Sequence, residues 1–521
     1  MPRNSILNLF FGGILLIISL YFLIWGFNYI GEANKIIFTI SVILGIFMAF
    51  NVGGNDVSNS FGTSVGAGTL TITQALCIAA IFEVGGAVIA GGEVTATIRS
   101  GIVDLQKMSV SPFDFVYIMM SALLAAGLWL LIATKKGMPV STTHAIVGGI
   151  VGASLTLGVI LEHSEISPLS ILRWNKLFEI VLSWIISPVL GGITSYMIYR
   201  VIKKYIINYN AIAQIKIDRI KRKKKELKKE HKKIYETLND LQKVAYSEIL
   251  NKDLLEMQEH NLNYKHLSSD YYKKINELDM QKEKLQSHKA LELGIPIIAA
   301  FETIVLVSML LFKGLKNLNL GLSAFQNYLI ISMCATIVWA AMFVFAKNLR
   351  RSDLSKSTFL MFSWLQVFTA CGFAFSHGSN DISNAVGPFA AIIDTLATGA
   401  VNGEAAIPPI VMITFGIALV AGLWFIGREV IQTVGTNLTK MHPASGFSAE
   451  LSAASIVMLA TVFGIPVSST HILIGAVLGI GLVNKAANWS LMKPIVLAWV
   501  ITIPVAAVIS SISLLVFRNI F

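Results

Sequence analysis

The chain has 521 residues, of which 55% are hydrophobic and 14% charged, and its mean hydropathy is +0.69. Apolar segments of membrane-spanning length recur from end to end without the period-two alternation of an outer-membrane barrel, which excludes a soluble globular protein and indicates an all-α polytopic membrane protein. The net charge of +11 does not indicate a nucleic-acid partner, because residues 203–290 hold 21 Lys and Arg against 13 Asp and Glu.

The first half begins with an apolar run at 6–30 that follows Arg3 and lacks a convincing cleavage site. It predicts an additional, uncleaved N-terminal transmembrane helix within residues 1–34. The run 36–52 then leads into the polar phrase GGNDVSNSFGTSVGAGTLT at 53–71, whose glycines predict a helix break or a re-entrant hairpin. Further helices, expected at 72–99, 113–134, 141–161 and 175–202, complete a first repeat half at 35–203.

Residues 204–290 differ in kind from the rest of the chain. Ile220, Leu227, Ile234 and Leu241 recur every seven residues among charged residues, which is typical of a coiled coil. A weaker stripe, formed by Leu267, Tyr271, Leu278 and Leu285, predicts the returning helix. We therefore expect a soluble antiparallel helical hairpin with its turn near 250–262. Its basic run at 216–233 places it on the cytoplasmic side by the positive-inside rule.

The second half, 291–521, begins with two scaffold helices expected at 291–313 and 324–347, and the basic loop after them also reads as cytoplasmic. The second copy then starts from inside at 358, whereas an N-terminus held inside by Arg3 makes the first copy start from outside. The two halves are therefore predicted to be inverted repeats of a secondary transporter. The second copy occupies 358–395, and helices are expected after it at 408–434, 448–463, 468–484 and 494–517.

Two polar phrases repeat in the same order in both halves. GGNDVSNSFGTSVGAGTLT at 53–71 returns as HGSNDISNAVGPFAAIIDT at 377–395, and GMPVSTTH at 137–144 returns as GIPVSSTH at 464–471. An Asn-Asp pair alone is an ordinary turn, and Ser or Thr after Pro is an ordinary helix cap. Their ordered duplication within membrane segments favours a functional site, because ionisable groups at membrane depth usually line a pathway.

The Asn-Asp phrases point to a cation. Asn55, Asp56 and Asn59 fall at i, i+1 and i+4, and Asn380, Asp381 and Asn384 repeat that spacing. Carboxylate and amide oxygens suit Na⁺, H⁺ or a divalent ion and are poor ligands for soft metals. We assign cation binding to Asp56 and Asp381, and we link Glu83 and Glu450, two further carboxylates in apolar segments, to the same cation.

The Pro-Val-Ser phrases point to an anion. A proline followed by hydroxyl residues is a helix start, where free N–H groups and hydroxyls form a donor-rich cradle for an oxyanion. Neither phrase contains Lys or Arg, so an anion beside the carboxylates would be repelled unless cations accompanied it. This balance favours symport over an anion channel. The expected substrate-binding residues are Asn55, Asn59, Ser141, Thr142, Thr143, Asn380, Asn384, Ser468, Ser469 and Thr470.

These four phrases, with FEVGGAV at 82–88 and GFSAELSAA at 446–454, closely resemble the inorganic phosphate transporter (PiT) family over 36–200 and 291–517. Membership implies cation-coupled uptake of inorganic phosphate by an inverted-repeat protein, commonly a homodimer, in the plasma (bacterial inner) membrane. It also implies that both pairs of phrases hold phosphate and cations, and that Glu83 and Glu450 take part in transport. The chain differs from the usual family pattern in its extra first helix, in Ser469 for Thr, and in GGND for GAND.

The sequence alone leaves several alternatives open. The family includes sulfate carriers, so another oxyanion is the first alternative, and a receptor or scaffold acting through the hairpin is the second. An enzyme or ATP-driven pump is not expected, because the chain has no GxxxxGK[ST] nucleotide motif. No cofactor and no metal beyond the co-transported cation are expected. Na⁺ is favoured for that cation because neutral oxygens surround the carboxylates, with H⁺ or a metal-phosphate complex as the other choices.

Overall fold

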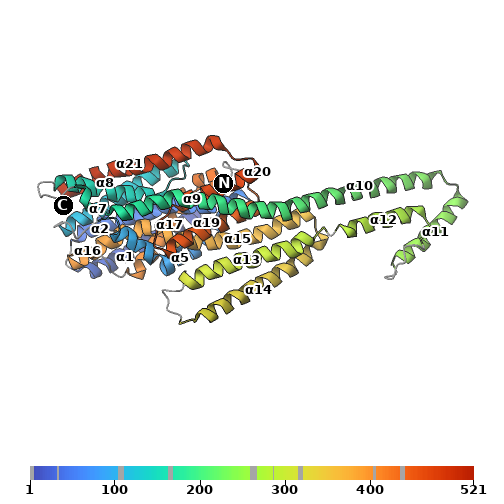
Figure 1. Ribbon diagram of the computed structural model, residues 1–521, viewed down its shortest axis with the longest axis horizontal. Helices are drawn as coiled ribbons and strands as arrows, with labels where there is room; N and C mark the ends of the chain where they lie inside the picture. Colours follow the sequence, from blue (N-terminus) through green and yellow to red (C-terminus); the bar gives the residue numbers. More distant parts are fainter. Residues whose placement is uncertain are drawn as a thin grey trace. The chain divides into compact units, whose positions relative to one another are not determined.

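The computed structural model describes residues 5–31, 34–103, 111–161, 168–258, 267–285, 287–314, 321–402, 407–434 and 441–521. These residues are helical apart from turns and one isolated bridge between Val103 and Leu172 (Figure 1). Twelve of the described helical segments are long and apolar enough to cross a membrane. This confirms the predicted all-α membrane fold.

The chain divides into two compact units. The first holds Met1–Arg200, Ala300–Thr336 and Phe362–Phe521, and the second holds Val201–Ala299 and Ile337–Met361. The boundary at Arg200 lies close to the start of the hairpin expected from sequence. The second unit also includes the stretch around residue 350, which the sequence placed with the second half.

The first repeat half begins with α1 (Ser5–Ile30) and α2 (Lys35–Val52). The interruption that the glycines predict is a π-helical segment, Gly53–Val57, after which α3 (Ser58–Gly66) continues. The expected helix at 72–99 is divided into shorter pieces, with its last break at Gly91. They are α4 (Ile72–Ile78), a π-helical segment (Ala79–Glu83), α5 (Val84–Ala90) and α6 (Gly92–Ser100), followed by α7 (Pro112–Lys135), α8 (Thr142–Ile160) and α9 (Trp174–Ile202).

The second half comprises α13 (Ile295–Met309), α14 (Ala324–Asn348), α15 (Leu354–Asp381), α16 (Ser383–Thr398), α17 (Pro409–Ile426), α18 (Arg428–Gln432), α19 (Pro443–Val462), α20 (Ser469–Asn484) and α21 (Trp489–Ile520). The helix expected at 408–434 is two helices that meet at Gly427. A Cβ added there would lie 2.0 Å from the hydroxyl of Ser58, so only glycine fits.

Backbone contact between the halves positions the site. A Cβ added at Gly53 would lie 1.7 Å from the carbonyl oxygen of Leu419, and one added at Gly422 would lie 1.7 Å from that of Phe50. The chain at α2 and its π-helical continuation therefore touches α17 directly, an approach that small residues allow between membrane helices. This contact holds the first Asn-Asp phrase against the second half.

The two Pro-Val-Ser phrases begin helices as expected. Ser141 caps α8, where its hydroxyl accepts a hydrogen bond from the backbone N–H of His144 at 3.2 Å. Ser468 caps α20 in the same way, accepting from the N–H of His471 at 3.2 Å. Each cap satisfies one of the N–H groups that a helix start leaves without a partner.

The second unit contains α10 (Asn208–Thr237), α11 (Asp240–Gln258) and α12 (Asp270–Lys284). The prediction of a single turn near 250–262 is wrong for the described residues, because α11 is helical to Gln258. Residues 259–266 lie outside the described part. The chain leaves its first helix at Leu238 instead. Asn239 and Gln242 explain the new start, since each side chain accepts a hydrogen bond from the other's N–H at 2.9 and 3.1 Å.

The predicted heptad stripe is buried only along part of its length. Ile220 is 7% exposed, whereas Ile234 is 52% and Leu241 is 85% exposed. Side chains from both later helices nevertheless pack on the end of α10, since the ring of His231 stacks on Tyr271 of α12 at 4.0 Å and lies 5.6 Å from Tyr246 of α11. The coiled-coil pattern therefore ends where the Asn239 cap begins a new helix.

Candidate functional site

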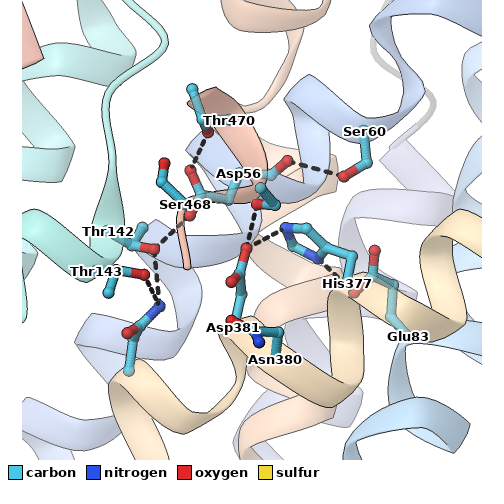
Figure 2. Close-up of polar contacts among 12 residues, drawn as sticks. Asp56, Ser60, Glu83, Thr142, Thr143, His377, Asn380, Asp381, Ser468 and Thr470 are labelled. Atoms are coloured by element: carbon cyan, nitrogen blue, oxygen red, sulfur yellow. Dashed lines mark hydrogen bonds and ion pairs between the residues drawn. The ribbon is translucent and has the colours of Figure 1, made fainter. Parts of the chain in front are cut away.

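Asp56 lies in the π-helical segment Gly53–Val57, where it receives hydroxyl groups from both halves (Figure 2). Thr142, in the first turn of α8, donates to its Oδ2 atom. Thr470, in the first turn of α20, donates to its Oδ1 atom at 2.9 Å. The carboxylate of the first phrase is therefore bound by the starts of two helices that lie far apart in the sequence.

Asp381, at the end of α15, is the counterpart in the second half (Figure 2). Ser469 donates its hydroxyl to Oδ2 of Asp381, as Thr142 does to Asp56. The ring atom Nε2 of His377 lies 2.8 Å from the same oxygen. The two aspartates thus have matching hydroxyl partners, and only the second also contacts a histidine.

Asn55 and Asn380 make the same set of contacts in their own halves. Asn55 Nδ2 donates to Thr134 Oγ1 at 3.0 Å and to the carbonyl of Met138, and Asn55 Oδ1 accepts from the N–H of Val140. Asn380 repeats all three contacts with Thr461, Ile465 and Val467. Both asparagines therefore bind the loop that enters the Pro-Val-Ser phrase, which aligns each aspartate with its helix start.

Asn384 joins the phrase of the second half to the helix start of the first. Its Nδ2 atom donates to Thr142 Oγ1 at 2.9 Å and to Thr143 Oγ1 at 3.3 Å. Thr143 in turn donates to the carbonyl of Val467 at 2.9 Å. The side chain of Asn59, the corresponding residue of the first phrase, lies outside the described residues.

His377 links Glu83 to Asp381, a role that the sequence did not assign. Its Nδ1 atom lies 2.8 Å from Glu83 Oε2 while its other nitrogen faces Asp381. Both ring nitrogens can donate at once only in the protonated imidazole. A sequence signal existed, because His377 precedes Asp381 by four residues, which places both side chains on one face of α15.

Ligand atoms of Asp56, His377 and Asp381 all lie within 4.8 Å of one another. Apart from their contact with one another, their described side-chain partners are hydroxyl groups and the Glu83 carboxylate, with no Lys or Arg side chain. Two carboxylates with hydroxyl neighbours form a set of hard oxygen ligands. The arrangement can therefore bind a cation and, once neutralised, tolerate an anion.

Glu450 of α19 has its own set of partners, separate from the hydrogen bonds around the aspartates. Its Oε1 atom accepts from Thr63 at 2.6 Å, from Ser64, and from Gln366 at 3.0 Å, while its Oε2 atom accepts from Thr369 at 2.9 Å. Four donors on one carboxylate stabilise a buried negative charge. The sequence had singled out Glu450 but not these four residues.

Each half also places a histidine next to a tryptophan. The ring of His144 lies 3.9 Å from that of Trp184, and the ring of His471 lies 3.7 Å from that of Trp499. The two histidine rings are perpendicular, with centroids 4.5 Å apart. These contacts pack the first turns of α8 and α20 against each other and show that the repeated histidines have equivalent surroundings.

The candidate site is buried. None of the described site residues is more than 2% exposed in this conformation. The set comprises Asn55, Asp56, Glu83, Ser141, Thr142, Thr143, Asn380, Asp381, Asn384, Glu450, Ser468, Ser469 and Thr470. A solute can therefore reach these groups only if the surrounding helices move.

The chain resembles known proteins over nearly its whole length. A protein of Mycobacterium bovis named as a candidate phosphate permease is 57% identical over 498 residues, which cover 95% of this chain and 90% of that protein. A protein of Haemophilus influenzae with the same kind of name is 34% identical over 494 residues, covering 92% and 97%. A solved structure described as the sodium-dependent phosphate transporter matches with a TM-score of 0.70 and 29% identity, covering 93% of this chain and 100% of that one.

The family comparison agrees with these relatives. Residues 52–510 match the phosphate transporter family, and this span includes both copies of both repeated phrases. The resemblance drawn from those phrases is thus confirmed, and the chain belongs to the phosphate transporter family.

Proposed function

We propose that this protein carries inorganic phosphate across the membrane by cation-coupled symport. The observation that carries the proposal is the buried pair Asp56 and Asp381, whose partners among the described residues are hydroxyl groups and His377, with no Lys or Arg side chain. Buried carboxylates at membrane depth are costly unless a cation accompanies them. The coupling ion would supply the missing positive charge.

Phosphate would bind where the starts of α8 and α20 meet. Thr142, Thr143, Ser469 and Thr470 bring four hydroxyl groups to the positive ends of two helices. A hydroxyl can donate its hydrogen to an oxyanion, and the lone pairs of its oxygen can coordinate a cation. The same groups can therefore bind both ions. Asn384 would orient this cradle through Thr142 and Thr143.

The order of binding follows from electrostatics. Phosphate near neutral pH carries between one and two negative charges, and like charges a few ångströms apart in a low-dielectric site cost several kcal/mol. The aspartates must therefore bind a cation or become protonated before phosphate binds. Glu83 would act through His377, and Glu450 would hold a further coupling charge in its separate set of donors.

Na⁺ is the coupling ion that we favour. The neutral oxygens around Asp56 and Asp381 suit Na⁺ coordination, whereas a proton relay would need only the carboxylates. The described resemblance to a sodium-dependent phosphate transporter supports this choice. Alternating access of two inverted halves would open the buried site to each side in turn.

The remaining parts of the proposal concern assembly and placement. We place the protein in the plasma (bacterial inner) membrane as a homodimer, with residues 204–290 in the cytoplasm. The basic run of α10 supports that orientation, since cytoplasmic loops carry an excess of Lys and Arg. The domain plan is an additional helix at 1–34, repeat halves at 35–203 and 291–521, and the cytoplasmic hairpin between them.

The test is uptake of labelled phosphate by proteoliposomes that contain the purified protein. We expect uptake of labelled phosphate. An excess of unlabelled phosphate should suppress it, and the same concentration of sulfate should leave it unchanged. Uptake of labelled sulfate with no phosphate uptake would replace the substrate by another oxyanion. Absence of uptake of either ion from correctly inserted protein would reject transport and favour a receptor or scaffold.

A further inference from the structure

The second unit contains a cavity of about 780 Å³ that belongs to none of the features described above. The end of α12, the segment 287–293 and the end of α14 with Arg350 form its walls, and all of them belong to that one unit. The volume falls within the range of small-molecule sites in proteins. Its side chains are mostly charged, so an apolar ligand is not a suitable occupant.

Two of the three carboxylates that line the cavity are already neutralised by basic partners. Asp279 pairs with Lys224 of α10. Glu292 pairs with the Arg350 guanidinium through both of its oxygens, with 2.6 Å between Arg350 Nη2 and Oε2. These two carboxylates therefore have basic partners of their own, and Lys347 adds only a smaller attraction to Glu292.

Three lysines of the wall form no ion pair with a carboxylate of the described residues: Lys282, Lys289 and Lys347. Lys347 is held to the wall by the ring of Phe343, whose centroid lies 4.5 Å from its Nζ atom. The wall contains one further carboxylate, that of Glu283, which opposes the charge of these lysines. Three unneutralised ammonium groups around one cavity attract an anion.

The histidine of the wall does not change this balance. Burial lowers the pKa of His288 below its ordinary value of 6.5, so the ring is neutral near pH 7. Its Nδ1 atom lies 3.1 Å from the hydroxyl of Ser287, which orients the ring. A neutral imidazole can still donate or accept a hydrogen bond at the cavity.

The cavity lies where two candidate membrane spans end. Lys289 immediately precedes the span Ala290–Phe312, and Lys347 is the penultimate residue of the span Ala324–Asn348. Lysines at such positions lie at the level of the lipid headgroups. An anion could therefore arrive either from the bilayer surface or from the adjoining aqueous phase.

We propose that this cavity is a binding site for a phosphate-bearing anion held by Lys282, Lys289 and Lys347. Phosphate groups carry up to two charges on several acceptor oxygens, which suits three ammonium groups that act as separate point charges. The source is either the headgroup of an anionic phospholipid or a soluble phosphorylated compound. The site is independent of the transport site and does not require the proposed symport.

The experiment uses the full-length protein in nanodiscs and two triple variants of equal charge. The first combines Lys282→Gln, Lys289→Gln and Lys347→Gln. The matched control combines Lys225→Gln, Lys228→Gln and Lys229→Gln, three exposed lysines of α10 outside the cavity. One arm measures binding of tripolyphosphate in phosphatidylcholine discs, and the other counts phosphatidylglycerol retained from mixed discs by native mass spectrometry.

In at least one arm, the cavity variant should bind at least about tenfold more weakly than the wild type, because each lysine near a phosphate contributes roughly a fivefold factor. The control should stay within about threefold of the wild type, as expected for lysines outside the site. The arm that responds identifies the source, soluble compound or lipid. Equal behaviour of the two triple variants in both arms would overturn the proposal. Circular dichroism establishes that both variants are folded.

Discussion

Thr470 donates a hydrogen bond to Asp56 at 2.9 Å, although the two residues are 414 positions apart in the chain. The hydroxyl comes from the helix start of the second half, and the carboxylate comes from the polar phrase of the first. The contact therefore exists only while the two halves are in this arrangement. It is a direct test of whether the halves form one site.

We expect Thr470→Val to weaken transport without preventing insertion. The substitution keeps the branched shape and removes the hydroxyl from a buried carboxylate, and a hydrogen bond to a charged group contributes about 1.5–3 kcal/mol. The apparent affinity for phosphate or Na⁺ should fall by roughly ten- to a hundredfold. Concentration series in proteoliposomes measure this, with Thr336→Val, at an exposed position of α14, as the control. Identical curves for both variants would show that the contact plays no part.

We expect Asp56→Asn and Asp381→Asn each to abolish or severely reduce phosphate uptake. Each change removes a charge that the coupling cation would pair with, while the side-chain volume stays the same. The measurement compares initial uptake rates at equal amounts of inserted protein. Asp218→Asn, a half-exposed residue of α10, serves as the matched control and should transport like the wild type. Normal uptake by either aspartate variant of the site would remove that residue from the mechanism.

Sodium coupling makes a distinct prediction about the driving force. Phosphate uptake into sodium-free, proton-buffered vesicles should rise when an inward Na⁺ gradient is imposed, and the apparent phosphate affinity should improve with Na⁺. The reason is that Na⁺ would neutralise Asp56 and Asp381 before the anion binds. Uptake that ignores Na⁺, follows an imposed pH gradient and collapses with a protonophore would instead make the same carboxylates proton carriers.

The charged helices of the second unit should be dispensable for transport. Their described ion pairs, such as Lys224 with Asp279, are partly exposed. Replacing residues 210–285 with a flexible linker should leave measurable uptake. Loss of all uptake in a correctly inserted deletion would make these helices part of the transport mechanism. Single cysteines introduced there should resist a membrane-impermeant reagent added outside, which tests their cytoplasmic placement.

The contact between α11 and α12 should weaken in acid. Burial alone would raise the pKa of Asp253, but hydrogen bonds from the Ser269 hydroxyl and from the N–H groups of Ser268 and Ser269 lower it below 3.8. A lowered folded-state pKa means that Asp253 stabilises the fold fully above the unfolded value and loses this effect as the pH falls through the folded value.

Hydrogen exchange of the full-length protein measures this effect. Near neutral pH, Asp253→Asn should reduce the protection of amides at the start of α12 relative to the wild type. That difference should shrink as the pH falls from the ordinary aspartate pKa of 3.8 through the lower folded-state pKa, where the wild-type carboxylate becomes protonated. Equal protection of both proteins near neutral pH would show that the carboxylate does not anchor the helix. Asp240→Asn, at the exposed start of α11, is the control.

Local sequence determined the elements of this protein. Apolar runs predict membrane helices because their backbone groups must pair internally in lipid. Ser141 and Ser468 predict helix starts because their hydroxyls cap N–H groups only a few residues away. The Asn239 cap was equally local, so the early end of α10 could have been predicted from the sequence as well.

Pairings across the chain were decided by the tertiary structure. The repeated phrases indicated which residues belong together, but not that Thr470 would contact Asp56 rather than Asp381. His377 contacts Glu83, which lies 294 positions away in the sequence, and Glu450 accepts hydrogen bonds from residues of α3 and α15. These contacts depend on how closely the helices approach, as at Gly53 and Gly422, where the chain passes backbone against backbone. Helix packing is a property of whole surfaces, and spacing along one helix does not specify it.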